Sequence, residues 1–234
     1  MMRGRSGCTG QPERHDTRSL KLHGRSTEWG PNVNGWDAGS VAITVVPYSP
    51  DWPKQFARVA ADLQRALKRV PILSIEHVGS TSVPGLAAKP IIDIDIVVER
   101  QNVPEAIAAL VGIGYVHRGN LGVTDRESLA APDDEPRRNV YVCVAGTLHL
   151  RNHLAVRKIL RERDDLRDRY GAVKTQLARD PSMDIETYLA LKSPILQEVL
   201  ALSELTDAEK RAILALNTGA AGAPEPHGSA RDLT

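Results

Sequence analysis

The chain has 234 residues, enough for one substantial core, so a single domain with irregular ends is the simplest expectation. Lys and Arg number 30 against 29 Asp and Glu, and this near-balance excludes the broad positive field of a general nucleic-acid binder. Cys8 and Cys143 are too few for a disulfide framework, and neither has a partner at zinc-ligand spacing. No apolar run has the length of a signal peptide or a membrane span, so we expect a cytoplasmic protein without a membrane partner.

The two ends of the chain differ in composition from its middle. Residues 1–40 and 217–234 are rich in small and polar residues without helical or strand periodicity, so we expect a disordered N-terminal arm and a disordered tail. The segment 42–216 is predicted to fold as one domain. Its sheet core should cover about 42–146 and its helical part about 147–216.

The first half of this folded segment alternates helices with strands. A capping serine followed by proline predicts a helix over about 49–70. Asn102 resembles the cap of a short second helix that ends by Gly112. Two β-branched runs between these helices, Ile72–Val78 and Pro90–Val98, predict strands.

The second half is predicted to be mostly helical. Residues 115–138 are polar and indicate a loop, after which Val140–Val144 predicts a third strand. Leucines and other apolar residues then recur at three- and four-residue steps, as in amphipathic helices. Three local signals mark these helices: a helix start at Asp184, a proline at Pro194 that should kink or break that helix, and a capping box formed by Thr206 and Glu209.

The strongest indication of a functional site is a pair of carboxylates on the second predicted strand, Pro90–Val98. Asp93 and Asp95 stand at alternate positions and must project from one face, while the isoleucines between them point to the other. Two adjacent like charges are explained by a divalent cation, because Mg²⁺ prefers one or two carboxylates together with phosphate oxygens and water. We therefore predict that Asp93 and Asp95 hold Mg²⁺ or Mn²⁺.

A phosphate-binding turn is predicted between the first two strands. Gly79 permits close approach of the backbone, and Ser80 with the following amides can bond a phosphate if the next residues open a helical turn. A lysine before the carboxylate strand and an arginine from the loop could neutralise its charge. The candidate phosphate- or nucleotide-binding residues are Gly79, Ser80, Thr81, Ser82, Lys89 and Arg126.

At these residues the sequence resembles the nucleotidyltransferase superfamily, whose pattern is Gly-Ser followed by Asp-x-Asp between apolar residues. More narrowly, HVGSTSVPGLAAKPIIDI, residues 77–94, is similar to the GrpB family, small bacterial proteins placed in that superfamily, some of them fused to dephospho-CoA kinase. The resemblance covers about 46–202 and implies an α/β (α+β) fold: a nucleotidyltransferase-like mixed sheet flanked by helices, with a helical C-terminal part. Further matches include Asn152-His153, Lys174, and Tyr188 with Lys192.

The resemblance implies a transferase, and one departure from its pattern bears on catalysis. Active superfamily members place a third acid on a neighbouring strand, whereas the candidate strand here, from Asn139 to Val144, contains none. The acids of the preceding loop that could replace it are Glu127, Asp133, Asp134 and Glu135.

Three functions follow from these features. The first is Mg²⁺-dependent binding of a nucleoside triphosphate with transfer of a nucleotidyl group to an unknown acceptor, in which Asp93 and Asp95 are catalytic. The alternative is a non-catalytic module that binds a nucleotide or another phosphate ligand on the same fold. The third is an interaction protein that uses its helical C-terminal half.

Each motif also has an ordinary structural interpretation. Gly79-Ser80 alone is typical of a strand-to-turn connection, and the aspartates could form a solvated strand face. His77 is expected to be structural. His149 and His153 have the i, i+4 spacing of metal ligands but no HExxH glutamate and no third ligand nearby, which favours helix packing or capping.

Overall fold

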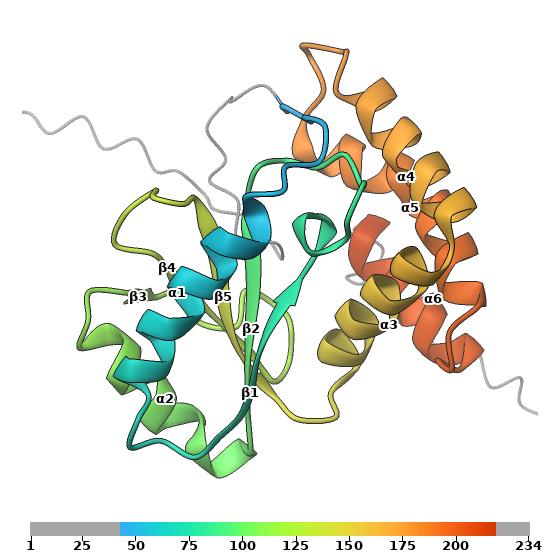
Figure 1. Ribbon diagram of the computed structural model, residues 1–234. Coiled ribbons are helices and arrows are strands. Elements are labelled where there is room, and N and C mark those ends of the chain that lie inside the picture. The colour runs from blue at the N-terminus through green and yellow to red at the C-terminus, as the bar shows by residue number, and fades with distance from the viewer. Residues whose placement is uncertain (1–42, 219–234) are drawn as a thin grey trace, which may run out of the picture. The chain divides into compact units, whose positions relative to one another are not determined.

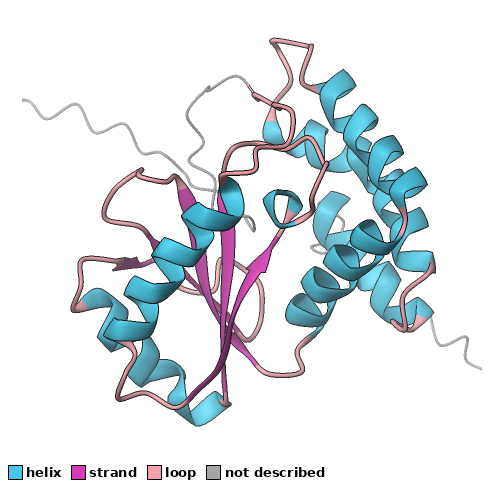
Figure 2. Ribbon diagram, viewed as in Figure 1, coloured by secondary structure: helices cyan, strands magenta, loops and turns pink. Residues whose placement is uncertain are grey.

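The computed structural model describes residues 43–218, so the predictions for residues 1–40 and for most of the tail lie outside the described residues. The predicted architecture is confirmed: a mixed sheet is flanked by helices and followed by a helical C-terminal part (Figures 1 and 2). None of the helices in this range is both long and apolar enough to cross a membrane.

Five strands form the sheet in the order β1-β2-β5-β4-β3. β2 and β5 are parallel, and every other pair of neighbours is antiparallel. The strands are β1 (Ile72–Val78), β2 (Ile92–Val98), β3 (Val116–His117), β4 (Arg126–Ala130) and β5 (Arg138–Val144).

The prediction of a continuous loop over 115–138 was wrong, because β3 and β4 lie within it. β3 has two residues, too few to show a periodic pattern. β4 reads Arg-Glu-Ser-Leu-Ala, so it lacks a β-branched run. Its strand conformation is imposed by the hydrogen-bonding edge of β5, which a local reading of the sequence does not contain.

The six α-helices within residues 43–218 divide between the two sides of the sheet. Figure 1 shows α1 and α2 on one side, and α3 to α6 gathered on the other. The helices are α1 (Trp52–Ala66), α2 (Val103–Val111), α3 (Leu148–Glu162), α4 (Asp164–Leu177), α5 (Ile185–Ala201) and α6 (Asp207–Thr218); two short 3-10 turns lie at Ser80–Ser82 and Arg100–Asn102. α6 includes residues 217 and 218, which we expected in the tail.

One face of the sheet is apolar, and the other carries Asp93 and Asp95 and is polar apart from a small cluster in which Val97, Tyr141 and Cys143 pack on Leu150 of α3. Ile92, Ile94 and Ile96 are almost completely buried in one core with Leu63 of α1 and Leu110 of α2. A second core joins α3 to α6 and also includes two residues of the turn after Ser82. Because the helices pack their apolar faces on one another and on this turn, the polar face of β2 and β5 is left to line a cavity.

The helix ends agree in part with the predicted signals. The Asp184 carboxylate accepts a hydrogen bond of 2.7 Å from the Thr187 amide, and the predicted capping box at the start of α6 is formed in both directions. The predicted Asn102 cap was wrong, since its side chain donates to the Pro71 carbonyl instead.

The predicted break at Pro194 was also wrong, because α5 continues through it. Proline lacks the amide hydrogen that closes the helical bond to the preceding turn. The carbonyl left without its usual amide donor is that of Ala190, and the nearby hydroxyl of Ser193 donates to the Leu189 carbonyl at 2.8 Å. Packing of this segment against α3, α4 and α6 holds the helix together across the proline.

Candidate functional site

The site is built on a close contact between Gly79 and Asp93. β1 and β2 are antiparallel, and Val78 pairs with Asp93, so the chain turns at Gly79 beside the carboxylate. A Cβ atom on Gly79 would lie 2.1 Å from Asp93 Oδ2, an impossible separation. Gly79 also has φ +67° and ψ −172°, a region that only glycine adopts without strain. The glycine is therefore required both by space and by backbone conformation.

Asp93 is further held by the neighbouring strand. Asn139 pairs with it in the parallel register, and the Asn139 amide donates a 2.8 Å hydrogen bond to Asp93 Oδ1. Burial raises the pKa of Asp93 above its ordinary value, although the Asn139 hydrogen bond opposes this. The strand on which the resemblance implies a third acid thus places an amide beside Asp93, and this amide stabilises the Asp93 carboxylate.

Asp95 projects from the same face of β2, as predicted, but has different surroundings. It is completely buried, and its Oδ2 lies 2.8 Å from Nδ1 of His153 on α3. Burial lowers the pKa of His153, but the Asp95 carboxylate outweighs this and raises it overall. The imidazole of His149 stands one turn earlier, with its centroid 4.0 Å from that of His153. The two histidines are therefore gathered at the carboxylate pair rather than used only for helix packing.

Three lysines gather opposite Asp93. Lys174 of α4 is 3% exposed, and its ammonium donates a 2.8 Å hydrogen bond to the Ser80 hydroxyl. The ammoniums of Lys89 and Lys192 lie 4.6 and 5.7 Å from the ring centroid of Tyr188 on α5.

These lysines perturb one another. Burial, followed by the charge of Lys192, lowers the pKa of Lys89 to about 8 and lowers that of Lys174 well below its ordinary value. Like charges held together out of water favour the binding of an anion, because an anion would relieve both the repulsion and the loss of solvation.

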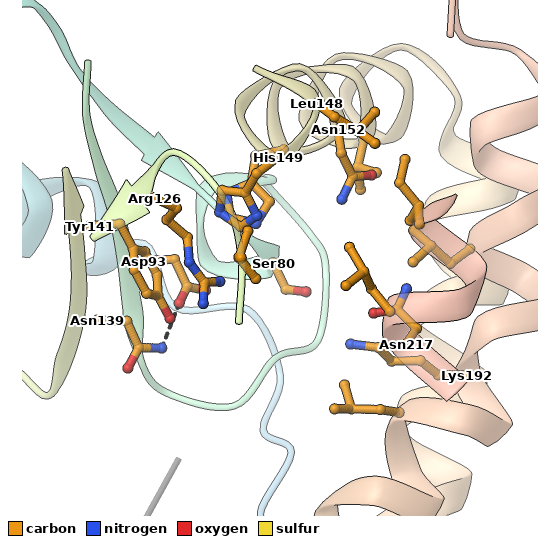
Figure 3. Close-up of a pocket in the computed structure, with 18 of the residues that line it drawn as sticks. Ser80, Asp93, Arg126, Asn139, Tyr141, Leu148, His149, Asn152, Lys192 and Asn217 are labelled. Carbon is orange, nitrogen blue, oxygen red and sulfur yellow. Dashed lines mark hydrogen bonds between the residues drawn. The ribbon is translucent and has the colours of Figure 1, made fainter. Parts of the chain in front are cut away.

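These groups face one cavity of about 550 Å³ between the sheet and the C-terminal helices. Figure 3 shows Ser80, Asp93 and Arg126 on the sheet side, with Lys192 and Asn217 across the space on the helical side. Lys89 and Lys174 also line it, whereas Asp95 does not. Of the predicted site residues, the structure brings together Gly79, Ser80, Thr81, Lys89, Asp93 and Arg126 as lining residues.

Thr81 and Ser82, two other predicted phosphate ligands, use their hydroxyls to bond to backbone carbonyls. The Thr81 hydroxyl donates to the Ile91 carbonyl, and the Ser82 hydroxyl donates to the Gly79 carbonyl at 2.7 Å. The helical turn that would help this segment to bind phosphate is present as a 3-10 turn over Ser80–Ser82. Arg126 is 2% exposed, with its guanidinium 4.6 Å from the Tyr141 ring centroid. Ser80 is thus the hydroxyl of this turn that lies nearest to the lysines.

The loop acids that could have replaced the third carboxylate point elsewhere. Glu127 contacts His117 at 2.7 Å and pairs with Val142, whose side chain belongs to the core on the other face of the sheet. Asp133 is paired with Arg138, and none of the acids from Asp133 to Glu135 lines the cavity. Within residues 43–218, the acids that line it are Asp93 and Asp125, and Asp125 is paired with Arg100.

Comparison with known proteins identifies the family. The family model described as GrpB protein matches residues 42–202. The chain belongs to the GrpB family. The crystal structure of the conserved protein GrpB from Enterococcus faecalis is similar, with a TM-score of 0.59 and 36% identity over 68% of this chain and 98% of that one.

Two curated relatives differ in how much of their own length this chain matches. A UPF0157 protein of Halalkalibacterium halodurans is 36% identical over 173 residues, which cover 71% of this chain and 85% of the relative. A dephospho-CoA kinase of Mycolicibacterium paratuberculosis is 28% identical over 70% of this chain. This chain spans 46% of that longer protein.

The Gly79 contact gives a matched pair of variants. Gly119 also has a positive φ, +75°, but nothing lies within 4 Å of a Cβ built on it. Gly119→Ala should therefore cost only backbone strain, on the order of 1 to 3 kcal/mol of unfolding free energy. Gly79→Ala should cost about 1 to 3 kcal/mol more, because it adds the overlap with Asp93. Urea unfolding measures both, and equal losses would contradict the contact.

A second prediction concerns His77, which lies 3.0 Å from the Thr81 hydroxyl and stacks on Phe56. Burial, followed by the charges of Arg161 and Arg157, lowers its pKa to about 4. The unfolded chain therefore takes up this proton first as the pH falls below about 6.5, and stability is lost down to the folded pKa. Between pH 7 and 5 the loss should be about 2 kcal/mol.

The matched variant for this test is His77→Gln, which keeps a polar group but does not titrate. We expect its unfolding free energy to fall less than that of the unchanged protein over the same pH range. If both proteins lose the same amount, His77 is not the buried neutral group described here.

Proposed function

We propose that this protein binds a nucleoside triphosphate, or a related ligand with a phosphate chain, together with Mg²⁺. The ligand would occupy the cavity between β2 and the C-terminal helices, with its phosphates toward Ser80. The observation that carries this proposal is the convergence of Lys89, Lys174 and Lys192 on Ser80 and Tyr188, opposite Asp93.

The phosphate part of the proposal rests on charge and space. An ammonium as buried as that of Lys174 is costly unless a negative group compensates it. Bound phosphate would supply that charge and accept hydrogen bonds from the lysines and from Ser80. The cavity volume of about 550 Å³ lies within the range of about 300 to 1,000 Å³ that is usual for small-molecule pockets.

The residues present fit Mg²⁺ at Asp93. Its carboxylate lines the cavity and belongs to the side opposite the lysines, and burial disfavours its charge, which a cation would stabilise. A hard cation with one protein carboxylate keeps phosphate oxygens and water as its other ligands. The predicted second ligand, Asp95, is bonded to His153 and does not line the cavity, so we assign direct contact with the cation to Asp93.

Binding is favoured over transfer because, within residues 43–218, Asp93 is the one carboxylate lining the cavity that is not paired with an arginine, so no further carboxylate stands ready as a base for an acceptor hydroxyl. The strand on which a third acid is expected presents Asn139 to Asp93 and carries no acid, and the loop acids from Glu127 to Glu135 do not line the cavity. Without a positioned general base a transfer reaction loses about 10² to 10⁴-fold in rate. We therefore propose that nucleotide binding, and not turnover, is the measurable property of this protein.

The test compares lysine variants that carry the same change of charge. Lys174→Met and Lys192→Met should each weaken nucleoside triphosphate binding by about 10- to 100-fold, because each removes a charge-assisted hydrogen bond worth about 1.5 to 3 kcal/mol. Lys158→Met, on an exposed position of α3, is the control and should bind as the unchanged protein does. Isothermal titration calorimetry with Mg²⁺ gives the three affinities.

The metal part is tested separately with Asp93→Asn. This variant should lose the increase in affinity that Mg²⁺ produces, while its binding without Mg²⁺ persists. The proposal fails if Lys158→Met weakens binding as much as the other two, or if Mg²⁺ acts equally on Asp93→Asn. A nucleotidyl transfer activity abolished by Asp93→Asn would restore the catalytic alternative.

A further inference from the structure

A second group of metal-binding side chains lies beside the cavity, at Asp95. Cys143 stands on β5, the strand next to β2, and His149 stands in the first turn of α3, which follows β5 after a short connection. One ligand atom from each of Asp95, Cys143 and His149 lies within 4.8 Å of the other two. The fold thus gathers an oxygen, a sulfur and a nitrogen from three separate elements.

Two of these residues also have a buried polar atom without the partner that such atoms need. Asp95 Oδ1 and His149 Nε2 have almost no exposed surface and no hydrogen-bond partner in the described part of the chain. Cys143 is completely buried, and its thiol beside Asp95 is a weak donor that does not replace a full hydrogen bond. Buried polar atoms are nearly always satisfied, so these unsatisfied atoms indicate a missing partner.

A cation is the partner that suits all three atoms at once. It would accept electron pairs from the carboxylate oxygen, the imidazole nitrogen and the sulfur, whereas a bound anion would be repelled by Asp95. The other oxygen of Asp95 is fixed by the 2.8 Å contact with His153, in the way that a neighbouring hydrogen bond orients a metal ligand. Asp95 and a Cys143 thiolate would together balance the charge of a divalent ion.

We propose that Asp95, Cys143 and His149 form a binding site for a transition-metal dication of the zinc class. The mixed oxygen, sulfur and nitrogen donors fit zinc, whereas Mg²⁺ takes oxygen ligands almost exclusively. Three protein ligands leave a fourth position for water, and His149 lies on the wall of the cavity from which such a water would come. This site differs from the one at Asp93 in ligands and in metal.

Cobalt provides a direct test, because thiolate ligation of Co²⁺ produces a near-ultraviolet charge-transfer absorption. The tag-free full chain, with Cys8→Ser to remove the other cysteine and with bound metal removed by a chelator, is titrated with Co²⁺ and then with Zn²⁺. We expect one equivalent of Co²⁺ to bind with this absorption, and Zn²⁺ to abolish it by displacement. No nucleotide is added, so the result is independent of the proposed phosphate site.

Ligand variants locate the metal. Cys143→Ser should lose the charge-transfer band, and Cys143→Ser and His149→Gln should each weaken Zn²⁺ binding by about 100-fold or more, since even outer-shell partners contribute about 10- to 100-fold. His117→Gln, on β3 away from the cluster, is the matched control and should bind Zn²⁺ normally. Circular dichroism establishes that each variant is folded.

A second measurement needs no variant of Cys143. X-ray absorption of the zinc-loaded Cys8→Ser protein should show one sulfur at about 2.3 Å together with nitrogen and oxygen neighbours. The proposal is overturned if the protein binds no equivalent of Co²⁺ or Zn²⁺, if the zinc has no sulfur neighbour, or if Cys143→Ser binds zinc as tightly as its parent.

Discussion

The close contact between the backbone of Gly79 and the Asp93 carboxylate determines much of the arrangement around the cavity. Because Gly79 has no side chain, Oδ2 of Asp93 occupies the volume that a Cβ atom would need. The chain then continues directly into the short turn that presents Ser80 to Lys174, while the hydroxyls of Thr81 and Ser82 bond to backbone carbonyls and hold the turn. The contact of Gly79 with Asp93 therefore places the predicted phosphate-binding turn directly beside the carboxylate.

Two aspartates that are equivalent in the sequence pattern are distinct in the folded chain. Asp93 faces the cavity and is supported by an amide from β5, whereas Asp95 is buried against His153 of α3. The difference arises because His153 and Leu150 of α3 pack around Asp95 and its neighbour Val97, whereas Asp93, two residues earlier on β2, lines the cavity. Our two proposals follow this division, with a hard cation and phosphates at Asp93 and a softer cation at Asp95.

Local patterns predicted the parts of the fold whose signals lie within a few residues. We predicted the strand Ile72–Val78, the alternation of Asp93 and Asp95 with buried isoleucines, and the start of a helix at Asp184, because each of these features depends on near neighbours in the sequence. β4 was missed because its strand conformation depends on β5. The roles of Lys174 and Lys192 could not be assigned either, although both lie in the family resemblance, because only the packing of α4 and α5 brings them to Ser80. Similarly, Cys143 and His149 lack any standard ligand spacing, and they meet Asp95 only in the folded chain.

The measurement that tests this account most directly is a crystal structure of the protein with a non-hydrolysable nucleoside triphosphate and Mg²⁺. The account predicts that the phosphate chain lies between Ser80 and the ammoniums of Lys174 and Lys192, with the cation joining Asp93 to phosphate oxygens. Nucleotide bound outside this cavity, or within it with the phosphates directed away from the lysines, would contradict the central claim.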